Sequence, residues 1–436
     1  MDRFDLFPDT THIENDTLTI AGCNLAYLAE QYGTPLYLYD RATLDHSLKS
    51  YQEPLEQFYP GLSGVTYAGK AFLCLAIAEW TQQHNLWLDC AGQGEIAIAL
   101  QAGVPREHLL VHGVNKSAAD LEAACEHAGI LVVDNLSEMG RLVEISHSRS
   151  LPELWFRFQP GLEVQTHAHI QTGQAGSKFG MDSAQLVEAA RICRDQHLSF
   201  SGLHFHLGSQ LRDHETYLRG IELVLDLAVG IGFDGQWTLS PGGGWGVAYH
   251  EDELPQPEPG DLIRWMAETL VRGCKERKLT LPRLQVEPGR SLVARSGVAL
   301  YRVGTVKQAG DRVWALLDGG MADNPRPALY GARYSALPVQ APGRPAEGPL
   351  WFAGPYCESG DVLIEALPFP MVKEGDLIAV PVSGAYQLSM GSNYNGAFRP
   401  AVLWLDQGHA QVIQEREKVE DLMRRDHRLV KPDGKG

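Results

Sequence analysis

Short apolar runs recur along the first two thirds of the chain, and each has the length and residue content of a β-strand. Valine, leucine, aromatic residues and small residues dominate them, and polar residues cluster where they end. The runs are GVTYAGKA (64–71), LWLDCAG (86–92), LLVHG (109–113), ILVVDN (130–135), ELWFRFQ (153–159), FSGLHFHLG (200–208), QWTLSPGGG (236–244) and RLQVEPGR (283–290).

The segments between these runs have apolar positions at helical spacing, as in AADLEAACEHAG (118–129) and SAQLVEAARICRDQ (183–196). Strands and helices therefore alternate, with eight strands in all, which predicts an α/β fold built on a (β/α)₈ TIM-type barrel. A doubly wound open sheet also alternates strands and helices, so the pattern alone leaves that second architecture open.

The pattern changes after about residue 292, where strand-like runs with Gly and Pro turns replace the alternation. Runs such as GVALYRVGTVKQAG (297–310) predict a second, mainly antiparallel β domain, either a sandwich or a barrel. TLTIAG (17–22) and LYLYD (36–40) are predicted to add strands to it. We therefore expect an N-terminal segment (1–40) that contributes to the β domain, a barrel (41–291) and a C-terminal β domain (292–436).

Composition narrows the possible functions. The 37 Lys and Arg residues against 54 Asp and Glu give a net charge of −17, which argues against a nucleic-acid or anionic membrane surface. No apolar run reaches membrane-spanning length, and the acidic amino terminus lacks a signal-peptide pattern. The seven cysteines are scattered without CxxC spacing. We expect a cytoplasmic enzyme with reduced thiols, without a zinc framework and without nucleic-acid or membrane partners.

Polar residues gather near the carboxyl ends of the predicted strands, which is the end at which TIM barrels carry their active sites. The position of these polar residues along the strands therefore predicts an active site at the carboxyl end of the barrel, independently of any sequence motif. The residues are Lys70, Asp89, His112, Asp134, Arg157, His206, Gly242–Gly244, Glu287 and Arg290.

Lys70 lies in the otherwise apolar stretch TYAGKAFL (66–73). It could be a strand-end lysine whose stem packs while its ammonium stays in water. It could also be an amine held in a pocket for covalent chemistry, in which case desolvation and neighbouring cations would favour the reactive neutral form.

PGGGWG (241–246) follows a predicted strand, and its consecutive glycines could let backbone N–H groups cradle a phosphate. A simple tight turn explains the glycines equally well. Ser209, just past another strand, could add a hydroxyl to a phosphate site. In HFHLGSQ (204–210) the period of two places His204 and His206 on the same side, so a metal-dependent barrel hydrolase is a rival hypothesis.

EPGR (287–290) ends the last predicted strand with a carboxylate and a guanidinium. An ordinary ion pair would explain it, but a buried carboxylate facing a heteroaromatic nitrogen is the functional alternative. Together with an amine, a phosphate cup and a ring-stacking group, this carboxylate completes what pyridoxal 5'-phosphate (PLP) requires.

The ordered motifs resemble the fold-type III PLP-dependent decarboxylases, and among them the diaminopimelate decarboxylase family, over about residues 25–410. The resemblance implies an alanine-racemase-like barrel joined to a β domain. The motifs that carry it are YAGKA, RFQPGLEVQTHAHIQTG with SKFG, GLHFHLGSQ, PGGGWG, EPGR, RPALYGA, CESGD and GAYQLSMGSNYN.

By this resemblance, Lys70 looks like the lysine that forms a Schiff base with the cofactor, His206 stacks on its ring and Glu287 pairs with the ring nitrogen. Ser209 and the three glycines would hold the phosphate. The full set of cofactor residues that the resemblance implies is Lys70, Asp89, Arg157, His206, Ser209, Gly242, Gly243, Gly244, Glu287 and Tyr386.

The resemblance also implies a homodimer with shared active sites, each completed by the CESGD loop (357–361) of the partner. Cys357, beside Lys70 and His206, is then a catalytic candidate, with Cys357 or Lys70 as the proton donor. The residues that match the family's substrate binders are Arg290, Arg326, Tyr330, Glu358 and Tyr386.

A pair of arginines suits a substrate with a carboxylate at its far end, which a diamine decarboxylase would not need. The resemblance therefore implies PLP-dependent decarboxylation of meso-2,6-diaminopimelate to L-lysine and CO₂, in lysine biosynthesis. DCAGQGE (89–95), Gly69 and Tyr334 depart from the family pattern. They leave open a related decarboxylase of another amino-carboxylate: a siderophore precursor, a carrier-bound amino acid or a D- or L-basic amino acid.

A PLP-free homologue that acts as a regulatory binding partner is a third hypothesis. It is disfavoured because Lys70, His206, Glu287 and Cys357 are all present.

Overall fold

The computed structural model describes residues 3–162, 176–233 and 235–429. Two compact units divide the chain. Unit 1 comprises Met1–Thr11, Asp40–Val298 and Pro381–Ser389, and unit 2 comprises His12–Tyr39, Ala299–Val380 and Met390–Gly436. Most of the motif RFQPGLEVQTHAHIQTG lies outside the described residues.

Unit 1 extends the expected barrel (41–291) slightly, to Asp40–Val298, and two further segments differ from the expected domain limits. Residues 3–11 belong to unit 1 instead of the β domain, and Phe7 is buried there. Residues 381–389 also return to unit 1, where the backbone N–H of Tyr386 donates to the carbonyl of Ala71 at 2.8 Å. Such returns depend on contacts between segments far apart in the chain, which the local apolar pattern does not encode.

Unit 1 contains a closed barrel of eight strands in which every neighbouring pair is parallel. The last strand pairs with the first, with Leu284 opposite Ser63, so no open edge remains in this sheet. The predicted barrel is therefore confirmed, and the open sheet is excluded. The strands are β5 (Ser63–Ala68), β6 (Trp87–Cys90), β7 (Leu109–His112), β8 (Ile130–Val133), β9 (Glu153–Phe158), β10 (Phe200–Phe205), β11 (Thr238–Gly242) and β12 (Arg283–Val286).

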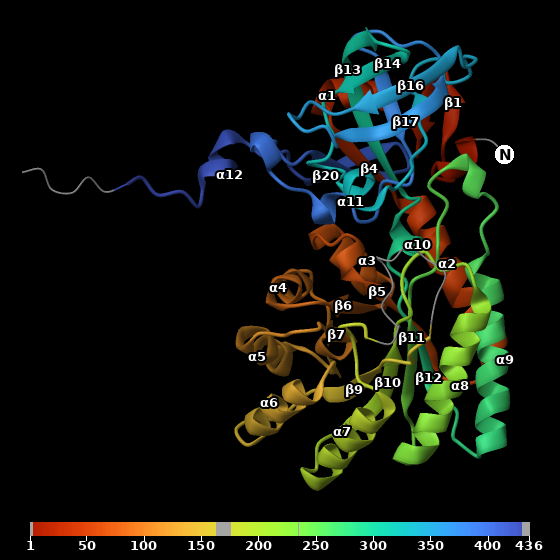
Figure 1. Ribbon diagram of the computed structural model, residues 1–436, viewed down its shortest axis with the longest axis vertical. Helices are drawn as coiled ribbons and strands as arrows, with labels where there is room; N and C mark the ends of the chain where they lie inside the picture. The colour runs from red at the N-terminus through yellow and green to blue at the C-terminus, as the bar shows by residue number, and fades with distance from the viewer. Residues whose placement is uncertain (1–2, 163–175, 234, 430–436) are drawn as a thin grey trace, which may run out of the picture. The chain divides into compact units, whose positions relative to one another are not determined.

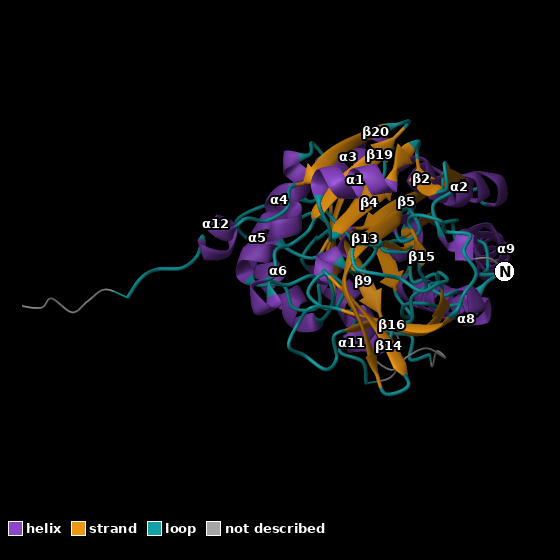
Figure 2. Cartoon of the chain, turned by 90° about the horizontal axis from the view of Figure 1, so that it is seen from above, coloured by secondary structure: helices purple, strands orange, loops and turns teal. Residues whose placement is uncertain are grey.

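Helices connect consecutive barrel strands, and in Figures 1 and 2 α4, α5 and α6 lie on the opposite side of the strands from α8 and α9. Several of them begin at a side chain that accepts a hydrogen bond from the first helical turn, as Ser117, Asn135 and Asp182 do. The helices of unit 1 are α2 (Arg41–Phe58), α3 (Leu75–Gln83), α4 (Gln93–Gln101), α5 (Ala118–His127), α6 (Leu136–Ser146), α7 (Ser183–Asp195), α8 (His214–Ile231), α9 (Pro259–Arg277) and α10 (Arg290–Val293).

The barrel strands are buried on both faces, which explains why their sequences are apolar at successive positions instead of alternating. One core cluster joins Leu110, Ile130, Val132 and Trp155 from three neighbouring strands. Gly202 faces this cluster closely, because a Cβ atom there would lie 2.5 Å from the indole ring of Trp155.

Unit 2 is built on β-strands that form a three-stranded and a nine-stranded sheet. The expected strands at 17–22 and 36–40 are present as β2 and β4. The pairs are mainly antiparallel, as predicted, but β14 and β16 are parallel, so the larger sheet is mixed. The strands are β1 (His12–Glu14), β2 (Thr17–Ile20), β3 (Cys23–Asn24), β4 (Leu36–Asp40), β13 (Gly297–Ala309), β14 (Arg312–Leu317), β15 (Leu337–Pro338), β16 (Gly348–Ala353), β17 (Val362–Phe369), β18 (Leu377–Val380), β19 (Ala401–Asp406) and β20 (His409–Gln414).

Three short α-helices accompany these strands: α1 (Leu25–Tyr32), α11 (Arg326–Tyr330) and α12 (Val419–Met423). All seven cysteines are free thiols, and Cys357 is the exposed one among them. Across the described ranges, no helix is long and apolar enough to cross a membrane.

Candidate active site

The carboxyl ends of the barrel strands bring together most of the predicted site residues. The closed barrel makes these ends neighbours, although the residues are spread over more than 200 positions of sequence. Lys70 follows β5, Asp89 lies in β6, Arg157 in β9, His206 and Ser209 follow β10, Gly242 ends β11 and precedes Gly243 and Gly244, and Glu287 and Arg290 follow β12.

Lys70 occupies a short 3₁₀ turn, Gly69–Ala71, and its side chain is exposed while its two neighbours are buried. The apolar stretch around Lys70 therefore does not bury its side chain within this chain. Its positive charge still acts on the site, since it opposes the upward shift in the pKa of Asp89 and helps to lower the pKa of Glu287.

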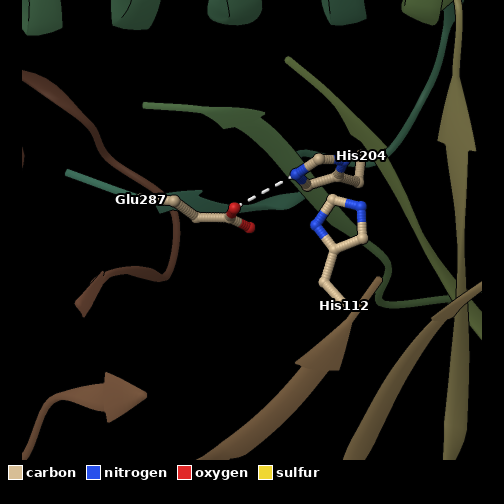
Figure 3. Close-up of side chains that lie close together, drawn as sticks. All are labelled: His112, His204 and Glu287. Carbon is tan, nitrogen blue, oxygen red and sulfur yellow. Dashed lines mark hydrogen bonds and ion pairs between the residues drawn. The ribbon is translucent and has the colours of Figure 1, made fainter. Parts of the chain in front are cut away.

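Glu287 is a buried carboxylate with a hydrogen-bond donor on each oxygen. His204 Nε2 lies 3.1 Å from Oε2, and the Ser240 hydroxyl donates to Oε1 at 2.6 Å. Figure 3 shows the His204 ring directed at this carboxylate. Burial works against the charged form, but the charge and hydrogen bond of His204 and the hydroxyl of Ser240 outweigh it and hold the pKa of Glu287 below its ordinary value. A carboxylate whose ionised form is stabilised by its neighbours therefore lies inside the barrel.

His112 and Arg157 extend this polar layer. The guanidinium of Arg157 lies 3.1 Å from His112 Nε2 and 3.5 Å from the Asp134 carboxylate. Because a guanidinium can only donate, His112 Nε2 must accept, which requires a neutral ring on that side. Burial and then the charge of Arg157 lower the pKa of His112 well below its ordinary value, in agreement with this assignment.

A metal ion is the alternative occupant of this layer, because atoms of His112, His204 and Glu287 lie within 4.8 Å of one another (Figure 3). His204 Nε2 is engaged by Glu287 and His112 Nε2 by Arg157, whose positive charge also opposes a cation, while His204 Nδ1 has no partner among the described residues. His206, paired with His204 in the hypothesis from sequence, is not part of this group of described residues. The geometry thus favours a hydrogen-bonded network over a metal site.

His206 lies beside the glycine turn. The backbone N–H of Gly243 points at His206 Nδ1 at 3.4 Å, so this nitrogen is the acceptor in the ring. Burial, followed by the charges of Lys70 and Arg157, lowers the pKa of His206 well below its ordinary value. The ring is consequently a neutral aromatic surface at working pH.

The glycine turn has no room for side chains. A Cβ at Gly243 would lie 2.1 Å from the carbonyl oxygen of Glu287, and one at Gly244 would lie 2.0 Å from that of Gly208. Gly244 also has φ +105°, which disfavours any other residue. The hydroxyl of Tyr217 donates to the carbonyl of Gly243 at 2.7 Å and fixes the turn. The result is a bare stretch of backbone at the barrel mouth.

Arg290 lies next to this turn and is buried. Its guanidinium donates to the hydroxyls of Tyr249 and Ser209, the latter at 3.1 Å, and stacks over the ring of Tyr386 at 4.5 Å. Its Nε has no hydrogen-bond partner among the described residues. A buried cation with an unused donor is a site for an anionic group.

Asp89 completes the set with a buried carboxyl whose Oδ1 has no partner among the described residues. Burial and the negative charge of Glu287 raise its pKa well above the ordinary value, while Lys70 and Arg157 oppose the shift. The pKa values of two neighbouring carboxyls are thus shifted in opposite directions, that of Glu287 downward and that of Asp89 upward. Such a separation of pKa values is typical of active sites.

Comparison with known proteins identifies the family. The family model described as "Pyridoxal-dependent decarboxylase, pyridoxal binding domain" matches residues 43–294. Diaminopimelate decarboxylase of Actinosynnema pretiosum subsp. auranticum is 38% identical, covering 97% of this chain and 95% of that protein. The chain belongs to the diaminopimelate decarboxylase family. It is accordingly a PLP-dependent carboxy-lyase, and its barrel holds the pyridoxal-binding part of the sequence.

Relatives and solved structures agree over nearly the whole chain. Diaminopimelate decarboxylase of Bacillus subtilis (strain 168) is also 38% identical, covering 94% of this chain and 95% of the relative. The diaminopimelate decarboxylase structure from M. jannaschii in co-complex with L-lysine superposes with a TM-score of 0.88 at 30% identity, covering 97% of this chain and 98% of the other. The family thus shares both units.

The residues present in unit 1 fit PLP. The bare backbone of Gly242–Gly244 can approach a phosphate, and the ionised Glu287 can face a protonated ring nitrogen. The unpartnered Asp89 Oδ1 and Arg290 Nε are polar atoms that a bound polar group would satisfy.

The predicted substrate residues of unit 2 form two groups. In the first group, Arg326 is buried on α11. Its guanidinium donates to the hydroxyl of Tyr334 and lies 5.7 Å from the centre of the Tyr334 ring. Tyr334, one of the departures from the family pattern, is therefore in direct contact with the arginine. Cys357 and Glu358 are exposed in a turn, and Tyr330 at the end of α11 is half-buried.

The turn that carries Cys357 and Glu358 is anchored by Asp361. This buried carboxylate accepts the backbone N–H groups of Met321 at 2.7 Å and Tyr356 at 2.9 Å. A side chain at Gly354 would collide with it, since a Cβ there would lie 2.3 Å from an Asp361 oxygen. Asp361 thus orders the turn from within its own chain.

Sequence reasoning missed several residues of the network. Ser240 and His204, which hold Glu287, were not assigned to the cofactor, although both lie on strand positions facing the barrel interior. Tyr249 and Tyr217, which contact Arg290 and Gly243, gave no signal in the sequence. Gly69 has a local cause, because a Cβ there would lie 2.9 Å from the carbonyl oxygen of Asp89.

Proposed function

We propose that the enzyme decarboxylates meso-2,6-diaminopimelate to L-lysine and CO₂ with PLP as its cofactor. The observation that carries the proposal is the buried, ionised Glu287, held between His204 and Ser240 at the mouth of a (β/α)₈ barrel. Structures of relatives that contain L-lysine support an amino acid with two nitrogen-bearing ends as the product. The proposed reaction would form this product by removing one of the two carboxyl groups of diaminopimelate.

Unit 1 supplies the residues that would hold PLP. Lys70 would link to the aldehyde carbon, Gly242–Gly244 and Ser209 would bind the phosphate, and Glu287 would face the ring nitrogen. When bound, PLP supplies an electron-accepting ring that takes up the electron pair left behind by CO₂. His206, a neutral aromatic ring, would lie against the cofactor, and the remaining cofactor residues would be Asp89, Arg157 and Tyr386.

The protein's own contribution is the control of protons and charge. By staying negative, Glu287 would keep a proton on the ring nitrogen of PLP. Arg157 donates to His112 Nε2, so His112 would not compete for that proton. His204 Nε2–H fixes the carboxylate in place. After CO₂ leaves, one proton must be delivered to the carbon, and we assign that delivery to Cys357 of the partner subunit or to Lys70.

Recognition of the far end of the substrate requires both an anion and a cation site. We assign the carboxylate to Arg290, Arg326 and Tyr330, and the ammonium to Glu358. Tyr386, whose ring stacks on Arg290, would border the same site. In this proposal the active enzyme is a homodimer whose Cys357 and Glu358 complete the partner's site, and it works in the cytoplasm.

A CO₂-release assay tests the proposal with purified, PLP-loaded enzyme. The expected substrate is meso-diaminopimelate, with little CO₂ from D- and L-lysine, ornithine or arginine, because only diaminopimelate has a carboxylate at its far end. Release from a substrate without that carboxylate, and none from diaminopimelate, would overturn the assignment of the arginines.

A further inference from the structure

A second pocket lies at the opposite end of the barrel from the candidate active site. Its lining includes the first residues of three barrel strands, Ser63, Trp87 and Arg283, together with His108 just before β7. Lys70 follows the last residue of β5, a strand of six residues that spans about 20 Å. The pocket is therefore separate from the Lys70 site and belongs wholly to unit 1.

Gln285 forms the closed floor of this pocket. Gln285 is 1% exposed, and its amide nitrogen donates to the Thr66 hydroxyl at 2.9 Å. Its Oε1 has no hydrogen-bond partner among the described residues. Because Gln285 is buried, this oxygen shapes the floor of the pocket but does not contact a ligand, so recognition falls to the groups of the wall.

The wall supplies a cation without a matching acid. Arg283 donates to the carbonyl of Ser63 at 3.3 Å and lies over the Trp87 ring at 5.5 Å. No carboxylate lies within ion-pair distance of it in the described part of the chain. Glu107, also in the pocket lining, is exposed and has no cationic partner there either. The pocket thus presents one positive and one negative group that do not neutralise each other.

The volume of the pocket, about 290 Å³, suits a small molecule. We propose that it binds an α-amino acid as a zwitterion, with the carboxylate on Arg283 and the ammonium on Glu107. The indole of Trp87 provides an apolar surface for the side chain of the ligand. Burial lowers the pKa of His108 and keeps its ring neutral. Arg283 and Glu107 are therefore the two charged groups that a ligand would match.

Equilibrium dialysis of the PLP-loaded enzyme with radiolabelled L-lysine tests this inference. Wild-type enzyme should retain a component of binding that Arg283→Gln and Glu107→Gln each weaken at least tenfold. Glu107 is exposed, so its variant tests the site without disturbing the core. Arg272→Gln, an exposed arginine of α9 outside this pocket, is the matched control and should bind like wild type.

Two further measurements separate this site from the catalytic one. Nα-acetyl-L-lysine, which keeps the carboxylate but lacks the α-ammonium, should fail to displace lysine from the Arg283-dependent component. CO₂ release from meso-diaminopimelate should be retained in Glu107→Gln. Lysine binding at the pocket does not depend on that reaction, so it can be measured even if the proposed reaction is wrong. Equal binding by all four proteins, or equal displacement by the acetylated compound, would overturn the inference.

Discussion

Ser240 provides a sharp test of the electrostatic argument, because its hydroxyl makes two contacts in the site. It donates to Glu287 Oε1 at 2.6 Å and accepts the backbone N–H of Gly242 at 3.2 Å. A hydrogen bond to a charged group contributes about 1.5–3 kcal/mol. Its loss in Ser240→Ala should raise the pKa of Glu287 by about 1–2 units, since one unit corresponds to 1.36 kcal/mol.

The direction of the pH effect follows from the role of the charged carboxylate. The charge on Glu287 is lost as pH falls through its pKa, so the acid limb of kcat/KM for CO₂ release should move upward by about 1–2 pH units in Ser240→Ala. The unpaired Gly242 N–H should lower the free energy of unfolding by about 1–3 kcal/mol, measured by urea denaturation.

Ser335 offers a matched control for the loss of a buried hydroxyl. Its side chain is also fully buried, but its Oγ has no hydrogen-bond partner within the described residues. Ser335→Ala should therefore leave the acid limb unchanged. If Ser240→Ala has the same pH profile as Ser335→Ala, Ser240 does not hold the charge on Glu287, and the reasoning is refuted.

Three further predictions concern turnover and stability. Lys70→Ala should abolish CO₂ release and the visible absorbance of the bound cofactor, and a fully active variant would contradict its covalent role. Lys116→Met should destabilise the barrel by about 3–5 kcal/mol in urea, because it leaves the buried Glu138 without its partner at 2.7 Å; a loss below about 1 kcal/mol would count against this. Burial raises the pKa of Asp323 to about 6, so its contribution to stability should be full below about pH 4 and decline by about 3 kcal/mol as pH rises through 6. Asp323→Asn should remove that pH-dependent component from urea midpoints measured between pH 4 and 7. If the midpoint changes between pH 4 and 7 as much in Asp323→Asn as in the wild type, the raised pKa of Asp323 is refuted.

The barrel could be predicted from sequence because parallel strands covered on both faces give uninterrupted apolar runs. Each expected run overlaps one observed strand, and the polar residue near its end marks the carboxyl end of the barrel. Glu287 and His206 were recognised in this way, since strand position and residue type together limit what they can do.

The network around these residues could not be predicted because it depends on closure of the barrel. His204 and Glu287 are 83 positions apart, and Ser240 and Glu287 are 47 apart, so no local pattern pairs them. The exposure of Lys70 depends on a 3₁₀ turn of three residues, whose geometry the apolar stretch around it does not specify.

The return of Pro381–Ser389 to unit 1 has a consequence for biosynthesis of the protein. A nascent chain that has emerged as far as Val298 holds all eight barrel strands, yet it still lacks Tyr386 and its hydrogen bond to Ala71. The scaffold can thus assemble on the ribosome before the site beside Lys70 is complete. For the same reason, neither unit can be cut out as one continuous gene segment and transplanted, because each is made of three separate segments of the chain.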